Sequence, residues 1–244
     1  MKILIIPDIH GRRFWKHPVE KYIDKVDKIV MLGDIGDPYN DETTEPIPWE
    51  QVSSNFEEII KLKRDNPDKV VLLLGNHDEH YRNEYYARLA TSTRYDRIHS
   101  RQLFDLFNHD NYNLFKICHE EIINDRRIVF SHAGITNYWL ESAKIKNDET
   151  MVDKINHLED SNKGIAKLAI IGKYRTWLGE KTGSPLWCDL REFISNERPS
   201  NFYQIFGHTK LRKGEIVSKE DFSCVDSRIA FMIDDDFKIT KINN

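Results

Sequence analysis

Three short, almost wholly apolar runs stand out in the first third of the chain. They are KILII (residues 2–6), KIVML (28–32) and VVLLL (70–74). Continuous apolar runs of this length predict strands that are covered on both faces. Two later runs, RIVF (127–130) and YQIF (203–206), have the same character, so five buried strands are predicted.

Between the first three runs, apolar residues recur at the spacing of an amphipathic helix. The segment 49–67 has this spacing and ends at Asn66-Pro67, and residues 19–26 repeat the pattern. The order strand, helix, strand, helix, strand predicts parallel strands joined by right-handed crossovers, which is an α/β fold.

The rest of the chain predicts fewer regular elements. Residues 222–242 indicate a β-meander with a turn at 234–236. The segments 80–120 and 135–200 are expected to be helical insertions around a functional site. Since no repeat, linker or change in composition divides the chain, one domain over residues 1–244 is predicted.

Composition narrows the class of protein. Of the 244 residues, 39% are hydrophobic and 31% charged, and the net charge is −4, so no overall charge favours nucleic acid or an anionic membrane as partner. The three cysteines are scattered and form no metal-binding pattern. The first apolar run is only four aliphatic residues long, and no run approaches the roughly 18 residues of a membrane span. We expect a cytoplasmic protein.

Polar residues directly follow each predicted strand. The five runs lead into PDIHG, GDIGD, GNHDEH, SHAG and GHTK. Ligands of open α/β sheets bind beyond the carboxyl ends of the strands, so these residues are expected to be functional. The side chains among them that bind metals or move protons are Asp8, His10, Asp34, Asp37, Asn76, His77, His132 and His208.

This mixture of carboxylate, imidazole and amide groups suits a hard or borderline divalent ion such as Mn, Fe or Zn. Two such ions held together suit an in-line attack on phosphorus. Taken singly, an aspartate before a turn is usually a turn former. Five motifs, each at the end of a predicted strand, are not explained by turn chemistry alone.

As a set, the motifs resemble those of the calcineurin-like metallophosphoesterases. The family signature DxH, GD, GNH[ED], a lone histidine and GH is matched from residue 8 to residue 208. The resemblance implies a four-layer α/β/β/α sandwich with a metal site at the carboxyl ends of the central strands. It also implies two divalent ions, Mn first with Fe or Zn as alternatives, and a hydroxide bridging them as the nucleophile. The implied ligands are Asp8 and His10 for the first ion, Asp34 as a bridge, and Asn76, His132 and His208 for the second.

The motifs favour one branch of this family. Many nucleases and phosphodiesterases of the family end in GHxH, whereas this chain has Lys210 at the last position. The serine/threonine phosphatase branch, which includes diadenosine tetraphosphatases, also lacks that histidine, and Asp37 matches the second aspartate of its GDxxDRG motif. Pro38 stands where the branch places a phosphate-binding arginine. The branch has a second arginine in its later half. Arg191 is the first candidate to bind phosphate in this way, followed by Arg12, Arg13 and Arg198.

The resemblance pairs Asp37 with His77 and implies that His77 is the general acid. A neutral imidazole cannot donate the proton that the leaving alkoxide needs, so the carboxylate of Asp37 is expected to raise the pKa of His77. Asp78 is expected to brace the loop, and the resemblance gives His80 no role.

The expected activity is hydrolysis of phosphomonoesters in phosphoproteins or small molecules, with nucleic acid and membranes not expected as partners. One alternative is hydrolysis of a nucleotide phosphoanhydride, as in a diadenosine tetraphosphatase. Another is an inactive metal-binding scaffold. The acidic segment 37–45 is either a solvated loop or a lid that disfavours highly anionic substrates. The aromatic residues that could stack a base, or else belong to the core, are Tyr81, Tyr85, Tyr86, Tyr174 and Trp177.

Overall fold

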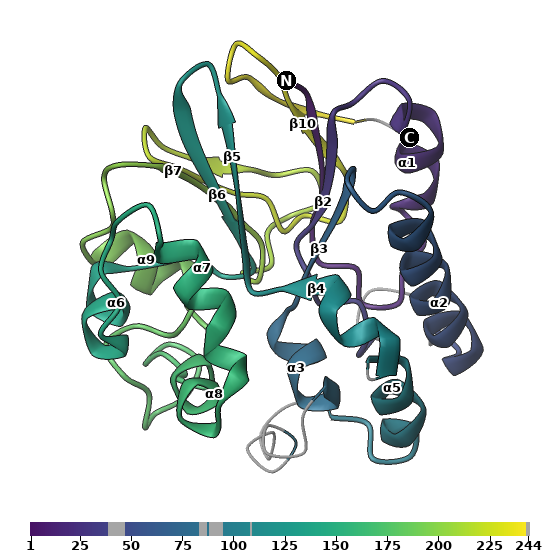
Figure 1. Ribbon diagram of the computed structural model, residues 1–244, viewed down its shortest axis with the longest axis horizontal. Helices are drawn as coiled ribbons and strands as arrows, with labels where there is room; N and C mark the ends of the chain where they lie inside the picture. The colour runs from purple at the N-terminus through teal and green to yellow at the C-terminus, as the bar shows by residue number, and fades with distance from the viewer. Residues whose placement is uncertain (39–46, 83–86, 88–94, 108, 243–244) are drawn as a thin grey trace. The chain divides into compact units, whose positions relative to one another are not determined.

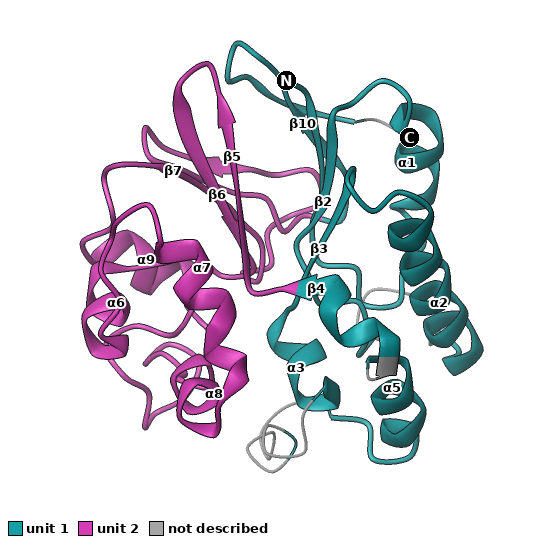
Figure 2. Ribbon diagram, viewed as in Figure 1, with its two compact units in different colours: residues 1–115, 228–244 teal, residues 116–227 magenta. Residues whose placement is uncertain are grey.

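A computed structural model describes residues 1–38, 47–82, 87, 95–107 and 109–242. The chain forms two compact units (Figure 2). Unit 1 comprises residues 1–115 and 228–244, and unit 2 comprises residues 116–227. Most of the acidic segment 37–45, together with Tyr85 and Tyr86, lies outside the described residues.

The sheet of unit 1 has the strand order β11-β10-β1-β2-β3-β4. The strands β1, β2 and β3 are parallel, and β10 pairs antiparallel with β1. Every residue of β1 and β3 is buried, which is why these strands read as unbroken apolar runs. Their bounds are Ile3–Ile6 (β1), Lys28–Met31 (β2), Val70–Leu73 (β3), Phe115–Lys116 (β4), Phe231–Ile233 (β10) and Ile239–Lys241 (β11).

Two crossover helices join the parallel strands of unit 1 and lie along one side of its sheet (Figure 1). The longer, α2 (Trp49–Asp65), buries Val52, Phe56 and Ile59 at helical spacing. The ring of Phe56 meets that of Phe107 at 4.4 Å between centroids, so α2 is held by the core of its own unit. The other helical segments are α1 (Lys16–Tyr22), α3 (Asn76–Arg82), α5 (Ser100–Phe107) and η1 (His109–Leu114).

The sheet of unit 2 has the order β5-β6-β7-β9-β8, with β7 parallel to both β6 and β9. One of its core clusters packs Phe193 against Phe206 and Phe222. Its strands are β5 (Cys118–Ile123), β6 (Arg126–Ser131), β7 (Tyr203–Phe206), β8 (Val217–Ser218) and β9 (Phe222–Cys224). Its helices are α6 (Asn137–Ala143), α7 (Met151–Asn156), η2 (His157–Asp160), α8 (Asn162–Leu168) and α9 (Leu190–Ser195).

The predicted α/β class is confirmed, with two multi-stranded sheets and helices, and so are the five buried strands. The predicted β-meander over 222–242 is confirmed in part, because β10 and β11 form an antiparallel hairpin across the predicted turn at 234–236. Its first strand, β9, pairs instead with β7 in the sheet of unit 2. The prediction of one domain over residues 1–244 stays a prediction. Among the described helices, none has the length and apolar character to cross a membrane.

Candidate active site

The predicted metal ligands and the predicted pair of His77 and Asp37 fall into two groups, one in each unit, and all of these side chains are buried. In unit 1 they follow the carboxyl ends of β1, β2 and β3. His10, Asp34 and Asp37 have left-handed backbone conformations, with φ of 46°, 49° and 46°. Non-glycine residues seldom adopt this conformation, and such strain concentrates at functional sites. Asp8, Asn76 and His77 complete this group.

Asp8, His10 and Asp34 offer a set of donors that fits a divalent cation. One ligand atom from each lies within 4.8 Å of the other two, and all three side chains are buried. His10 Nδ1 lies 3.0 Å from the carbonyl oxygen of Asp37. A carbonyl only accepts, so Nδ1 carries a proton, and in the neutral imidazole Nε2, 3.5 Å from Asp34 Oδ2, then offers its lone pair. This is the tautomer of a histidine that binds metal through Nε2.

Two glycines let the loops after β2 and β3 approach each other. A Cβ on Gly33 would lie 2.4 Å from the backbone nitrogen of Gly75, and Gly33 has a φ of +99°. A Cβ on Gly75 would lie 1.9 Å from Asp34 Oδ1. The same Asp34 oxygen accepts a hydrogen bond from the backbone N–H of His77 at 2.9 Å. The glycines in the Gly-Asp and Gly-Asn-His motifs therefore make the room that orients the Asp34 carboxylate.

Asp78 braces the same two loops, as expected from the sequence. Its carboxylate accepts hydrogen bonds from the backbone N–H groups of Ile35, Gly36 and Gly75 at 2.9, 3.3 and 3.0 Å. Burial raises its pKa to about 6, against the lowering effect of the backbone donors. The loops after β2 and β3 are thus joined by one buried side chain.

His77 and Asp37 form the predicted pair. His77 Nδ1 lies 2.9 Å from Asp37 Oδ2, and the His77 ring packs edge-on against that of His10 at 5.2 Å. Burial works to lower the pKa of His77, but the negative charges of Asp34, Asp37 and Asp78 and the hydrogen bond to Asp37 outweigh it, so the pKa is raised. The imidazole beside the candidate ligands therefore favours its protonated form.

Two further residues bind Asp37 and were not predicted. His80 Nε2 lies 3.1 Å from Asp37 Oδ2, and the Tyr81 hydroxyl donates to Asp37 Oδ1. Burial lowers the pKa of His80, and burial together with the Asp37 charge raises that of Tyr81. His77, His80 and Tyr81 share one face of α3 because they are spaced i, i+3 and i+4. That spacing is the signal in the sequence that could have found them, and it applies because GNHDEH is helical from Asn76 rather than a loop.

In unit 2 the predicted residues are His132, after β6, and His208, after β7. His132 Nε2 lies 3.1 Å from His208 Nδ1. Two nitrogen ligands of one ion, each bonded at roughly 2.0–2.1 Å, lie about this far apart, so the two histidines could bind the same metal ion. His208 also has a left-handed backbone, with a φ of 63°.

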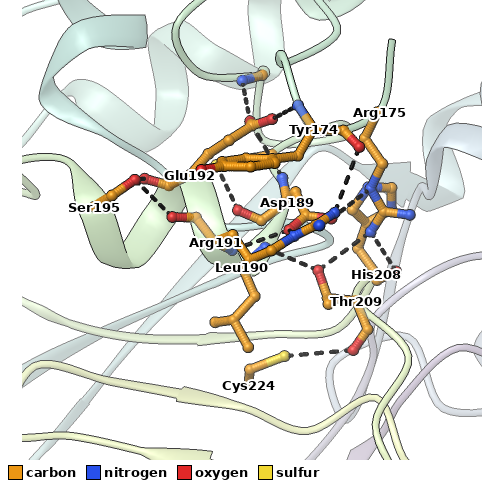
Figure 3. Close-up of polar contacts among 12 residues, drawn as sticks. Tyr174, Arg175, Asp189, Leu190, Arg191, Glu192, Ser195, His208, Thr209 and Cys224 are labelled. Carbon is orange, nitrogen blue, oxygen red and sulfur yellow. Dashed lines mark hydrogen bonds and ion pairs between the residues drawn. The ribbon is translucent and has the colours of Figure 1, made fainter.

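The predicted arginines are held in different ways. Arg191 binds Asp189 through Nε at 2.8 Å, stacks on the Tyr174 ring at 4.5 Å and is 63% exposed (Figure 3). Arg12 is half-buried, two residues after His10. Arg175 is not among the predicted site residues, yet its Nη2 donates to the carbonyl oxygen of His208 at 3.2 Å.

The model of one known protein family matches residues 1–225, and its description is calcineurin-like phosphoesterase. The chain belongs to this family. No curated protein sequence matches the chain significantly. The branch within the family, suggested by Lys210 and Asp37, stays a prediction.

Solved structures similar to this family member include a hypothetical protein from Pyrococcus horikoshii OT3 and the phosphoesterase Yfce from E. coli. The first is 11% identical, with a TM-score of 0.49, and the match covers 99% of this chain and 87% of that one. The second is also 11% identical, with a TM-score of 0.42 and coverage of 99% and 98%. The family assignment rests on the sequence match over residues 1–225.

Proposed function

We propose that the protein is a metal-dependent phosphatase that hydrolyses phosphomonoesters, in the serine/threonine phosphatase or diadenosine tetraphosphatase branch of its family. The observation that carries the proposal is the pairing of His77 with Asp37 directly beside the donor set of Asp8, His10 and Asp34. A proton donor next to a cation site is what cleavage of a phosphoester requires.

We assign six side chains to two divalent ions, with Mn expected. When bound, the ions polarise the phosphoryl group and supply an activated water as nucleophile. The donor chemistry of both groups supports the assignment, because buried carboxylates and imidazoles are stabilised by a cation. The proposed ligands are Asp8, His10, Asp34, Asn76, His132 and His208.

The chain's own residues supply the proton and its control. His77 holds the proton, and Asp37 holds the imidazole in the orientation that directs Nε2 away from the carboxylate. His77 Nε2 would then donate to the leaving oxygen as the ester bond breaks. His80 and Tyr81 hold the Asp37 carboxylate in place through hydrogen bonds to Oδ2 and Oδ1. Arg191 and Arg12 are the proposed contacts to the phosphoryl oxygens.

A substrate panel tests this proposal. We expect the Mn²⁺-loaded protein to hydrolyse phenyl phosphate or a phosphopeptide with a higher kcat/KM than diadenosine tetraphosphate or a nucleic acid. The absence of turnover on every substrate, with Mn²⁺ bound, would leave the inactive metal-binding scaffold as the correct account. Asp34→Asn is the matched control, because it removes a proposed metal ligand with little change in shape.

One observation favours the nucleotide alternative. Trp177 is 89% exposed and Tyr174 44% exposed, on the same turn as Arg175, so a base could stack there. Tyr81 cannot serve, because it is buried against Asp37. A higher kcat/KM for diadenosine tetraphosphate than for phenyl phosphate, lost in Trp177→Ala, would support this alternative.

A further inference from the structure

The turn that carries His208 adopts a conformation that needs support. His208 is a non-glycine residue with a φ of 63°, and the backbone N–H of Thr209 folds back to the carbonyl oxygen of Gly207 at 2.7 Å. Such a backbone persists only when its surroundings impose it. Contacts to this turn therefore decide where the His208 imidazole points.

Arg175 makes two such contacts (Figure 3). Its Nη2 donates to the carbonyl oxygen of His208 and to Thr209 Oγ1, both at 3.2 Å. Thr209 Oγ1 also accepts from the backbone N–H of Leu190 at 2.9 Å. One guanidinium group thus joins the His208 turn to the beginning of α9.

Asp189 balances the charge of Arg175. Its carboxylate lies 3.0 Å from Arg175 Nε, its side chain is only 4% exposed, and it caps the N-terminus of α9 in a capping box with Glu192. Since an unpaired cation beside a metal ligand would repel a divalent ion, this pairing lets Arg175 act through its hydrogen bonds.

The loop that presents Arg175 is itself fixed by a buried side chain. Glu192 is fully buried and accepts hydrogen bonds from the backbone N–H groups of Tyr174 and Gly183, at 2.8 and 2.9 Å. A Cβ on Gly172 would lie 1.8 Å from a carboxylate oxygen of Glu192, so the loop packs directly on it. Arg175 is therefore held at both its backbone and its side chain.

Arg191 provides an internal comparison. It binds the same carboxylate of Asp189, but its other contacts are the carbonyl oxygen and ring of Tyr174. Its side chain is 63% exposed, against 30% for Arg175. The two arginines share a partner, and the hydrogen bonds to the carbonyl oxygen of His208 and to Thr209 Oγ1 come from Arg175 (Figure 3).

We propose that Arg175 is a positioning residue for the metal ligand His208, acting through the carbonyl oxygen of His208 and the hydroxyl of Thr209. This inference rests on the proposed role of His208 as a ligand. Side chains that orient a ligand from outside the coordination sphere typically change metal affinity by about 10- to 100-fold when they are lost.

The test is a titration of the metal-free full chain with Mn²⁺ alone, with unbound Mn²⁺ measured by electron paramagnetic resonance. We expect Arg175→Met to raise a Kd for Mn²⁺ about 10-fold or more. In that variant Asp189 keeps Arg191 as a partner, so the cap of α9 is preserved. Arg191→Met is the matched control, because Asp189 then keeps Arg175, and its Kd should stay within about twofold of wild type.

Arg175→Lys distinguishes positioning from a general loss of structure. Its ammonium can still donate to one of the two acceptors, so its affinity should lie between those of the wild type and Arg175→Met. If circular dichroism shows that Arg175→Met is unfolded, Arg175→Lys becomes the test variant. An affinity for Mn²⁺ equal to that of the wild type would then overturn the inference.

The outcomes separate the two proposals. If the wild type binds no Mn²⁺, the proposed function fails, and this inference fails with it. If the wild type binds Mn²⁺ and both methionine variants bind it alike, only the role of Arg175 is refuted.

Discussion

Replacing Asp37 by asparagine should lower the free energy of unfolding, by an amount that follows from the groups around the Asp37 carboxylate. Burial alone would raise the pKa of the Asp37 carboxyl, but hydrogen bonds from His77 and His80 and their positive charge lower it from 3.8 to about 2. Tyr81 donates a further hydrogen bond to the same carboxylate. Asparagine keeps the shape and tolerates the left-handed backbone, so the substitution mainly removes the charge.

The fall in pKa from 3.8 to about 2 corresponds to about 2 kcal/mol of unfolding free energy at neutral pH. Because the pKa is depressed in the folded state, this contribution is complete above the unfolded value. It is lost as the pH falls through the folded value. At pH 3 it should be about half of its value at pH 7.

Urea unfolding with EDTA present measures this contribution without bound metal. We expect Asp37→Asn to lower the free energy of unfolding by about 2 kcal/mol at pH 7 and by about half as much at pH 3. Asp24→Asn, at an exposed site, is the control and should change it by less than about 0.5 kcal/mol. Equal losses for Asp37→Asn at pH 7 and pH 3, or no loss, would refute the reasoning.

Three further predictions concern the surroundings of this pair. Gly75→Ala places a Cβ 1.9 Å from Asp34 Oδ1, so it should cost roughly 1–3 kcal/mol in urea unfolding and weaken Mn²⁺ binding; unchanged values would show that the loops relax freely. Tyr81→Phe removes a donor to Asp37 and an acceptor for the backbone N–H of Asp96, and should cost about 1–3 kcal/mol in the same assay. An unchanged free energy of unfolding would show that the hydroxyl does not support Asp37. Treatment with EDTA should abolish phosphoester hydrolysis, and added Mn²⁺ should restore it. Activity that survives dialysis against EDTA, in protein that metal analysis shows to be metal-free, would contradict a metal-dependent mechanism.

Much of the candidate site could be predicted from the sequence because its signals are local. Apolar runs of four or five residues mark β1, β2, β3, β6 and β7, and the polar motifs follow them directly. The partnership of His77 with Asp37, 40 positions apart, came from the family motifs rather than from any periodicity.

What could not be predicted depends on long-range packing or on the exact start of a helix. His80 and Tyr81 reach Asp37 only because α3 begins at Asn76, immediately after Gly75. Arg175 reaches the His208 turn because Glu192, 17 positions further along the chain, fixes its loop. Neither the hydropathy of residues 172–183 nor their charge pattern indicates that contact.

The strand errors have a similar cause. The segment 118–123 reads CHEEII, whose alternation is broken by two adjacent glutamates, so β5 was missed. The three residues of β9 lie close in sequence to β10, yet they pair in register with Gln204, Ile205 and Phe206 of β7. Which sheet a short strand joins is decided by its tertiary partners.

The most direct test of the account is the leaving-group dependence of kcat in the wild type and in His77→Asn, both loaded with Mn²⁺ and matched in metal content. If His77 protonates the leaving oxygen, the variant should lose about 10²- to 10⁴-fold in kcat with phenyl phosphate, and far less with 2,4-dinitrophenyl phosphate, whose leaving group needs no proton. Equal losses with both substrates, or a wild type that hydrolyses neither, would contradict it.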